Sequence, residues 1–201
     1  ISKINETYLH IDCEKSIAQE LVDYFTFMVP NAKHMPSYKN KVWDGKIRLF
    51  HYRNHTLYLG LLPYVYKFAK DRGYDVECGD LELTNEFSNK EAEDFSKTLN
   101  LPFTPHDHQM KGFVTAIRDK RRLLVSPTAS GKSLIAYMIT RYRNNKTLII
   151  VPTTGLVGQL YGDFKDYSKN DDNFDVDEMV HTITSGSDKQ TDKSIVISTW
   201  Q

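Results

Sequence analysis

Hydrophobic positions follow one pattern in the first part of this chain and a different pattern after Pro105. Residues 1–80 contain short stretches in which apolar and polar side chains alternate, as in half-buried strands, and helical patterns lie between them. After Pro105, helical patterns alternate with nearly continuous apolar runs, which are typical of parallel strands covered on both faces. The change of pattern predicts two domains of different architecture.

The first part opens with an alternating stretch and an amphipathic helix. Residues 8–13 alternate as a strand does, and Ser16 with Gln19 predicts a capping box at the start of the helix. Pro30 ends the helical pattern. The apolar face of this helix is formed by Ile17, Leu21, Tyr24, Phe25 and Met28.

Two more alternating stretches, 46–52 and 56–59, surround a polar turn and predict a β-hairpin. Pro63 suits the first turn of a helix, and Gly73 suits the position just after its end. The short stretch 74–78 predicts a last strand. The first part is therefore predicted to be a small α+β domain with the element order β-α-β-β-α-β.

Residues 81–104 are acidic and contain one predicted helix from Lys90, so we expect a connector whose end is marked by Pro102 and Pro105. Residues 105–201 carry the alternating pattern of helices and apolar strands. The predicted elements are helices at 108–119, 132–143 and 155–167 and strands at 123–125, 147–151, 180–183 and 195–199. This order predicts a parallel sheet with helices packed against it.

The stretch around Lys132 has the order of a phosphate-binding loop: an apolar run at 123–125, a small polar turn, and then a helix. Backbone N–H groups in such a turn and at the helix N-terminus form a concave array of donors for an anion. Gly131 allows the backbone to approach a phosphate closely. Lys132 would reach the β- and γ-phosphates and Ser133 would ligate Mg²⁺, so these two are the predicted catalytic residues. The predicted nucleotide-binding residues of the loop are Pro127, Thr128, Ala129, Ser130, Gly131, Lys132 and Ser133.

The loop departs from the usual pattern, G-x-x-x-x-G-K-[ST], because Ser126 stands where the first glycine is expected. An alternative interpretation is an ordinary helix N-terminus with a serine near its cap. The apolar run before the loop and the amphipathic helix after it favour a nucleoside triphosphate site. The apolar side of that helix contains Ile135, Met138, Ile139 and Tyr142.

Charge is unevenly distributed, although 26 Lys and Arg balance 26 Asp and Glu. Basic residues outnumber acidic ones nine to two in 33–72, and acidic residues outnumber basic ones eight to two in 74–100. The basic stretch interleaves cations with aromatic residues, which together can bind the phosphates and exposed bases of nucleic acid. Its predicted nucleic-acid contacts are Lys39, Lys41, Lys46 and Arg48, interleaved with Tyr38, Trp43, Phe50 and Tyr52. Alternatively, the aromatic residues form a core and the cations a solvated face.

Composition narrows the class of protein. With 40% hydrophobic and 26% charged residues, the chain has the composition of a soluble globular protein. No apolar run approaches the roughly 20 residues that span a bilayer, and the N-terminus lacks the pattern of a secretory signal. Cys13 and Cys78 lack the close spacing of a metal site, which favours reduced thiols. We therefore expect a cytoplasmic protein that does not bind membranes.

Several stretches together resemble the front half of a superfamily-two helicase. In the order of the Q-motif, motif I, motif Ia and a motif Ib/Ic-type threonine, they are Gln109, 126–133, 151–159 and 197–201. More closely, the chain resembles the UvsW-type recombination helicases of T4-like phages. The stretches that carry this closer resemblance are 43–49, 127–133, 150–154 and 199–201. The resemblance covers nearly the whole chain and implies that its second part is the N-terminal part of a first RecA-like helicase lobe.

The resemblance implies ATP and Mg²⁺ as cofactors and nucleic acid as the partner. Gln109 would hydrogen-bond the adenine edge, with Phe103 or His108 as the candidate for stacking on the base. Hydroxyls and helix N-terminal N–H groups suit the phosphates of the nucleic-acid backbone. The corresponding residues are Thr153, Thr154, Gln159 and Thr199, with Ser185 and Gly186 further along the same edge. The alternative for the threonines is an N-cap on an ordinary loop.

Several functions remain open within this resemblance. The closer match implies a monomeric, ATP-dependent DNA motor of recombination and repair that acts on branched or forked DNA. Its reactions would be branch migration, fork regression, or the unwinding of RNA–DNA hybrids in R-loops. The alternatives are an RNA helicase, a restriction-type DNA translocase of the same superfamily, and a non-catalytic nucleic-acid-binding module whose phosphate loop is only structural.

An ATPase of this kind also needs a Walker-B Asp-Glu pair that holds Mg²⁺ and orients the attacking water. Asp177-Glu178 is the local candidate, but it follows a polar stretch instead of an apolar strand and precedes Thr199 instead of following it. We do not assign it that role. We expect the chain to be a fragment of a longer helicase that turns over ATP poorly on its own.

Overall fold

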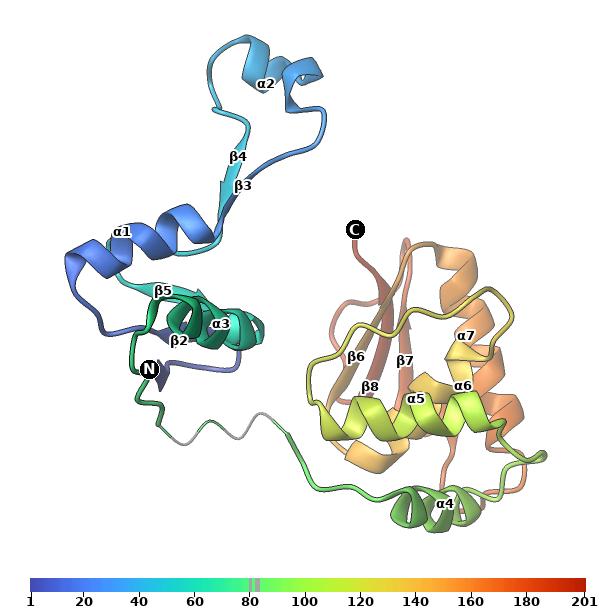
Figure 1. The fold of residues 1–201 in the computed structure, drawn as a ribbon. Coiled ribbons are helices and arrows are strands. Elements are labelled where there is room, and N and C mark those ends of the chain that lie inside the picture. The colour runs from blue at the N-terminus through green and yellow to red at the C-terminus, as the bar shows by residue number, and fades with distance from the viewer. Residues whose placement is uncertain (80, 82–83) are drawn as a thin grey trace. The chain divides into compact units, whose positions relative to one another are not determined.

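The computed structural model describes residues 1–79, 81 and 84–201. The chain divides into two compact units, Ile1–Glu82 and Leu83–Gln201, which are described separately (Figure 1). The strand pairs of the first unit are antiparallel, whereas those of the second are parallel. Among the described residues, no helix is both long enough and apolar enough to cross a membrane.

The body of the first unit is a small sheet with two helices. It consists of β1 (Ser2–Lys3), β2 (Tyr8–His10), α1 (Lys15–Tyr24), β5 (Thr56–Tyr58) and α3 (Leu62–Arg72). The sheet has the order β1-β2-β5, and Leu9 of β2 lies opposite Leu57 of β5. Both leucine side chains are fully buried. The helices complete this core with Ala18, Leu21, Val65 and Phe68.

Helix α3 has the boundaries that its sequence predicts. Pro63 lies in the first turn, where no N–H donor is needed, directly after the 3-10 turn η2 (Leu59–Leu61). Gly73 follows the last helical residue with a φ of +72°, a left-handed conformation that glycine adopts readily. The buried face contains Leu62, Val65, Phe68 and Ala69.

A two-stranded arm extends from this body (Figure 1). It consists of β3 (Thr26–Met28), the 3-10 turn η1 (Ala32–His34), the short helix α2 (Pro36–Lys39) and β4 (Lys46–Arg48). β3 pairs antiparallel with β4, so Phe27 lies opposite Ile47. Directly before β4, Gly45 has a φ of +76°, and a Cβ there would lie 2.8 Å from the sulfur of Met28. The turn into β4 therefore requires glycine.

The predicted start and end of the first helix are wrong. The N-cap of α1 is Glu14, whose side chain makes no cap hydrogen bond, so Ser16 and Gln19 form no capping box. The helix ends at Tyr24 and does not continue to Pro30, because the next residues take their backbone partners from β4. A distant strand has overridden a local helical pattern.

The predicted hairpin is also wrong. β4 pairs with β3 and β5 pairs with β2, so the stretches 46–52 and 56–59 contribute to different sheets. A single bridge between His51 and Thr56 joins them. The stretch 74–78 forms no strand. Alternation shows that a stretch suits a sheet, but it does not specify which segment becomes its partner.

The second unit is an α/β unit around a parallel sheet. Its strands are β6 (Thr147–Val151), β7 (Val180–Ile183) and β8 (Ile195–Thr199), in the order β6-β8-β7. Its helices are α4 (Asn89–Thr98), α5 (Asp107–Arg118), α6 (Lys132–Arg143), α7 (Thr154–Tyr167) and α8 (Val176–Met179). In the ladder, Ile149 of β6 and Thr182 of β7 both lie opposite Ile197 of β8. The predicted parallel sheet is confirmed.

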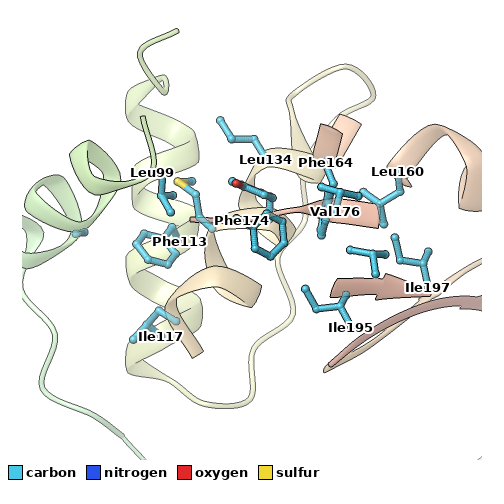
Figure 2. Close-up of a cluster of buried hydrophobic side chains, with 14 of the residues drawn as sticks. Leu99, Phe113, Ile117, Leu134, Leu160, Phe164, Phe174, Val176, Ile195 and Ile197 are labelled. Carbon is cyan, nitrogen blue, oxygen red and sulfur yellow. The ribbon is translucent and has the colours of Figure 1, made fainter. Parts of the chain in front are cut away.

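One hydrophobic cluster packs the helices against this sheet (Figure 2). Phe113 of α5, Leu134 of α6, Phe164 of α7 and Ile197 of β8 are all buried within it. The apolar area that these side chains remove from water is the main stabilising contribution to the unit. The cluster therefore holds α6, which begins at the predicted phosphate loop, against α7 and the sheet.

The segment 81–104, interpreted from its sequence as a connector, contributes to the same core. Phe87, Ala92 and Leu99 belong to the hydrophobic cluster. The helix predicted from Lys90 is α4, and Ser88 and Glu91 form a capping box at its start. The acidic side of α4 faces solvent, which explains why the segment has the composition of a connector.

Two predictions about apolar runs are wrong. Residues 123–125 form no strand in the described structure, and Leu123 and Val125 are 84% and 91% exposed. β6 is not covered on both faces, since Leu148 and Ile150 are 61% and 58% exposed. A strand forms only where a neighbour supplies backbone partners, and residues 123–125 have no such neighbour among the described strands.

Candidate nucleotide-binding site

The loop that precedes α6 has the backbone of an anion-binding turn. Ala129 and Gly131 adopt left-handed conformations with φ of +61° and +77°. Gly131 is the N-cap of α6, and its carbonyl oxygen accepts from the N–H of Leu134 at 3.1 Å. The N–H groups of the first turn therefore point out of the helix end toward the loop, where they are available to a phosphate.

Gly131 is required on steric grounds as well. A Cβ at this position would collide with the side-chain amide of Gln109. The positive φ adds a second reason, because residues with a Cβ rarely adopt this conformation. The loop and the side chain of α5 that contacts it thus fit together only when this residue is glycine.

Lys132 folds back over the loop. Its Nζ donates to the carbonyl oxygen of Pro127 at 2.6 Å and to that of Ser126 at 3.3 Å. The ammonium group thus donates to two neutral carbonyl oxygens. Phosphate oxygens are charged and would be stronger acceptors for the same group. Ser126 also hydrogen-bonds Ser130 through the two hydroxyls, so the serine that replaces the expected glycine closes the loop. The loop residues therefore suit a polyphosphate.

Two residues at the start of α5 contact this loop. Gln109 is only 6% exposed; its amide nitrogen donates to the carbonyl oxygen of Ser130 at 3.3 Å, and its amide oxygen accepts from the N–H of His106 at 2.8 Å. Nε2 of His108 lies 2.9 Å from the same Ser130 carbonyl oxygen. The structure thus brings the predicted adenine-binding glutamine and the predicted phosphate loop together.

The two candidates for stacking on the base lie in different places. His108 lines a cavity of about 730 Å³ that the loop residues 125–130 also line. Phe103 lines another cavity, of about 1040 Å³, with Leu101 and Met110. Because only His108 shares a cavity with the loop, it is the better placed of the two for a nucleotide bound there.

Tyr167 was not found by sequence reasoning. Its hydroxyl lies 2.7 Å from Oγ of Ser133, and its ring meets the ring of Phe103 edge-on at 5.7 Å. Burial raises the pKa of Tyr167 above its ordinary value; the hydrogen bond with Ser133 acts in the opposite direction, and the nearby Asp163 and Asp166 add to the rise. The hydroxyl therefore stays protonated at neutral pH. No local motif marks this tyrosine, which lies 34 positions from Ser133 in the sequence.

A magnesium ion would depend on the nucleotide for most of its ligands. The described residues contain no group of three or more His, Cys, Asp or Glu side chains that could hold a metal ion. Ser133 in the first turn of α6 supplies one hydroxyl oxygen, and Mg²⁺ commonly combines few protein ligands with phosphate oxygens and water. The donor set fits a metal that binds together with the triphosphate.

The acidic pair of α8 has local partners. Asp177 forms an ion pair with Lys165 at 2.8 Å and accepts a hydrogen bond from Tyr161. These two contacts lower the pKa of Asp177. Asp175 caps the same helix by accepting from the N–H groups of Asp177 and Glu178. These contacts give Asp175 and Asp177 a structural role at the start of α8.

The predicted nucleic-acid contacts of the second unit gather at one edge of the sheet. Because β6, β7 and β8 are parallel, their carboxyl ends lie at the same edge. Thr153 is the N-cap of α7, and its hydroxyl accepts from the N–H of Leu156 at 3.3 Å. The alternative interpretation, an N-cap on the loop, is therefore confirmed for Thr153. Thr199 lies opposite Val151 at the end of β8. The exposed residues at this edge or on α7 are Thr154, Gln159, Ser185 and Gly186.

The predicted basic contacts of the first unit lie on the arm. Lys39 and Lys41 line a groove of about 830 Å³ together with Tyr38 and Trp43, and both lysines are exposed. Lys46 and Arg48 are exposed on β4. Alternate residues of a strand share a face, so these two cations project to the same side.

One acidic residue moderates this charge. Asp44 pairs with Arg48 at 2.5 Å, and this contact raises the pKa of Arg48 and lowers that of Asp44. Among the aromatic residues, Phe50 is buried, whereas Tyr52 is exposed and Trp43 is half-buried. The alternative of an aromatic core therefore applies to Phe50 alone of these three.

Comparisons with known proteins agree with this organisation. Residues 4–79 match the family described as "DNA helicase UvsW, N-terminal", and residues 102–201 match "Type III restriction enzyme, res subunit". The chain is 34% identical to "ATP-dependent DNA helicase uvsW" of Enterobacteria phage T4 over 212 residues, covering 97% of this chain and 40% of that protein. It therefore spans less than half the length of this relative.

Two solved structures have the same fold. "The crystal structure of T4 UvsW" has a TM-score of 0.85 at 32% identity and is matched over 97% of this chain and 41% of that chain. "Crystal structure of the UvsW helicase from Bacteriophage T4" has a TM-score of 0.84 at 32% identity, with 97% and 72% covered. The fold and loop define a small α+β domain followed by a RecA-like P-loop lobe, as predicted. The chain belongs to the UvsW helicase family.

Proposed function

We propose that this chain is the front part of an ATP-dependent DNA motor that remodels branched DNA by branch migration, fork regression or R-loop unwinding. The observation that carries the proposal is the contact of Gln109 and His108 with Ser130 in the loop that also holds Lys132. In the proposed site, this arrangement would join the residue that recognises adenine to the loop that binds the triphosphate. The name of the phage T4 relative, an ATP-dependent DNA helicase, supports it.

The chain's own residues have distinct roles in the ATP site. Lys132 would exchange its two loop carbonyl partners for the β- and γ-phosphates, and Ser133 would supply a hydroxyl oxygen to Mg²⁺. Gln109 holds the loop in place through its hydrogen bond to the Ser130 carbonyl oxygen, and its side-chain amide would also contact the adenine edge. ATP, when bound, would supply the γ-phosphoryl group, whose transfer to water, with ADP as the leaving group, would drive the motor.

Nucleic acid would bind in two regions. The exposed Thr153, Thr154 and Gln159 and the half-buried Thr199 bind the phosphate backbone near the carboxyl edge of the sheet, because hydroxyl, side-chain amide and helix N-terminal N–H groups can donate to phosphate. In residues 1–80, the exposed cations of the arm bind phosphates without reading sequence. The motor lobe thus moves along the backbone while the small domain adds affinity for DNA.

The test measures ATP turnover by the full-length protein with no nucleic acid, linear duplex, forked DNA and single-stranded RNA side by side. We expect forked DNA to stimulate turnover most. Lys132→Ala should abolish turnover and all ATP-dependent activity, whereas Lys169→Ala, which removes an exposed ion pair with Asp166, should change neither. Activity that survives Lys132→Ala would instead identify a nucleic-acid-binding module whose loop is structural.

A second candidate is a restriction-type DNA translocase, because residues 102–201 match the family of the res subunit of type III restriction enzymes. Equal stimulation by linear and forked duplex would favour this candidate. Stimulation by RNA alone would favour an RNA helicase. Both outcomes would overturn the branched-DNA assignment while leaving the ATP site in place.

A further inference from the structure

The hydroxyl of Tyr167 contacts the residue that the proposed function assigns to magnesium. Oγ of Ser133 lies 2.7 Å from the Tyr167 hydroxyl oxygen. Ser133 is the second residue of α6 and follows the phosphate loop directly, whereas Tyr167 is the last residue of α7. A side chain from another helix therefore reaches the metal-ligand position of the loop.

The tyrosine ring is held in this position by aromatic packing. It meets the ring of Tyr137 at 5.5 Å and the ring of Phe103 at 5.7 Å, both edge-on. Tyr137 is fully buried and packs edge-on against Phe164 at 5.1 Å. The ring therefore packs against two residues outside α7, and these contacts restrict where its hydroxyl can lie.

The chemistry of a serine ligand gives this hydrogen bond a direction. A hydroxyl has one proton and two lone pairs. When the oxygen of Ser133 binds a cation through a lone pair, its proton must point elsewhere, and a neighbouring acceptor can fix that direction. Partners of this kind orient metal ligands and increase their affinity for the metal. The Tyr167 hydroxyl oxygen is at hydrogen-bond distance and has lone pairs to accept this proton.

We propose that Tyr167 is a positioning residue of the nucleotide site: it accepts the proton of the Ser133 hydroxyl and so turns the serine oxygen toward magnesium. The proposal rests on the proposed function, because it requires an ATP–magnesium site at Ser133. The proposal gives the two ends of α7 different roles. The last turn would support the nucleotide site, and the N-cap, Thr153, is a predicted nucleic-acid contact.

The test is the variant Tyr167→Phe in the full-length protein, which removes one oxygen and keeps the ring that packs against Tyr137 and Phe103. Affinity for a fluorescent, non-hydrolysable ATP analogue is measured with saturating Mg²⁺ and again in EDTA. A single hydrogen bond of this type contributes enough to change affinity by about threefold to tenfold. We expect binding to weaken by that factor in Mg²⁺ and to stay unchanged in EDTA.

A matched control lies on α6. Tyr142 packs against Phe87 and Phe95 at 4.7 and 5.1 Å, well away from the start of the helix. Tyr142→Phe makes the same chemical change as Tyr167→Phe and should leave both affinities unchanged. Circular dichroism and the unfolding midpoint of each variant show whether its fold is intact.

A double-mutant cycle separates positioning from a general packing effect. Ser133→Ala removes the ligand itself, so adding Tyr167→Phe to it should have no further effect on affinity in Mg²⁺. The proposal is overturned if Tyr167→Phe leaves the Mg²⁺ dependence unchanged, or if its effect persists in the Ser133→Ala background. If the unaltered protein binds no nucleotide at all, the proposed function fails and this inference fails with it; binding that is insensitive to Tyr167→Phe overturns the inference alone.

Discussion

The side-chain amide nitrogen of Gln109 lies 3.3 Å from the carbonyl oxygen of Ser130, although 21 positions separate the two residues. The amide oxygen of Gln109 accepts at the same time from the backbone of His106. One buried side chain thus joins the start of α5 to the loop before α6. Gln109, predicted as a reader of the base, also supports the phosphate loop.

The close approach of Gln109 makes Gly131 sensitive to substitution. Gly131→Ala should destabilise the protein by at least about 1–2 kcal/mol, because the left-handed φ penalises a Cβ and the new atom meets the Gln109 amide. It should also weaken ATP binding more than tenfold, since the loop must move. Urea unfolding and binding of a fluorescent ATP analogue measure the two effects.

Gly162→Ala in the interior of α7 is the control for this prediction. A Cβ at Gly162 meets open space, so alanine should stabilise the helix by about 0.5–1 kcal/mol. Adding Gln109→Ala to Gly131→Ala should restore part of the lost stability, because it removes the collision but not the φ penalty. Equal stability of Gly131→Ala and Gly162→Ala would contradict the steric explanation.

Asp171 forms the most buried ion pair among the described residues. Its side chain is 1% exposed and accepts from Arg141 at 2.7 Å, and the Arg141 guanidinium lies 4.0 Å from the centre of the Phe174 ring. Asp171→Ala should destabilise the second unit by about 3–5 kcal/mol, because it leaves the arginine charge without its carboxylate, with only the neutral Tyr137 hydroxyl as an acceptor, in a poorly hydrated site. Denaturant unfolding measures the loss.

The exposed pair of Lys97 and Asp94 offers a comparison with the buried pair. Their side chains are 73% and 59% exposed. Lys97→Ala should therefore change the free energy of unfolding by less than about 1 kcal/mol. If Asp171→Ala cost no more than Lys97→Ala, the buried pair would not be a major structural contact.

Reversal of charge on the arm should weaken DNA binding. The double variant Lys46→Glu and Arg48→Glu should reduce affinity for DNA of any sequence and lower the slope of log affinity against log salt by about two, one for each lost phosphate contact. Filter binding or fluorescence anisotropy at several salt concentrations measures the slope. Lys67→Glu on α3 reverses a single positive charge away from the arm and should leave the slope unchanged. An unaltered slope in the double variant would exclude the arm from the DNA interface.

Asp177 should contribute to stability above its ordinary pKa of 3.8 and not in strong acid. Lys165 and then Tyr161 lower its pKa in the folded state, so the contribution is complete above 3.8 and is lost as the pH falls through the lower folded-state value. Asp177→Asn should be less stable than the unaltered protein at pH 7, and the difference should shrink as the pH falls below 3.8.

Urea midpoints between pH 7 and pH 2 test this behaviour. Asp172→Asn, at an exposed carboxylate without an ion pair in the described part of the chain, is the control and should show no such change of difference with pH. A difference between Asp177→Asn and the unaltered protein that stayed constant across this range would show that the contact is not governed by the aspartate charge.

The sequence predicted those features that depend on neighbouring residues. Pro63 and Gly73 bound α3 as expected, because each acts on its own backbone position. The turn before Lys132 and the helix after it were also predicted, since glycine, small polar residues and helical periodicity are local signals. The parallel sheet followed from the order of apolar runs and helices, which restricts the possible topologies.

Features that depend on distant partners were not predictable in this way. The stretches 46–52 and 56–59 alternate as a hairpin does, yet their partners come from β3 and β2. Residues 123–125 have the composition of a buried strand but no strand beside them in the described sheet. The contact of Tyr167 with Ser133 depends on how α7 packs against α6, which no local pattern encodes.

Strand β6 has β8 on one side only among the described strands, and Leu148 and Ile150 face solvent. Its free edge presents backbone donors and acceptors that have no partner strand, beside an apolar surface, and such an edge is a template for adding a strand from another chain. The isolated 201-residue chain should therefore lose solubility as its concentration rises, in a manner insensitive to salt. Ile150→Lys would place a charge on this strand and should reduce the association of chains. The solubility of the chain is therefore governed by this one strand and not by its net charge of zero.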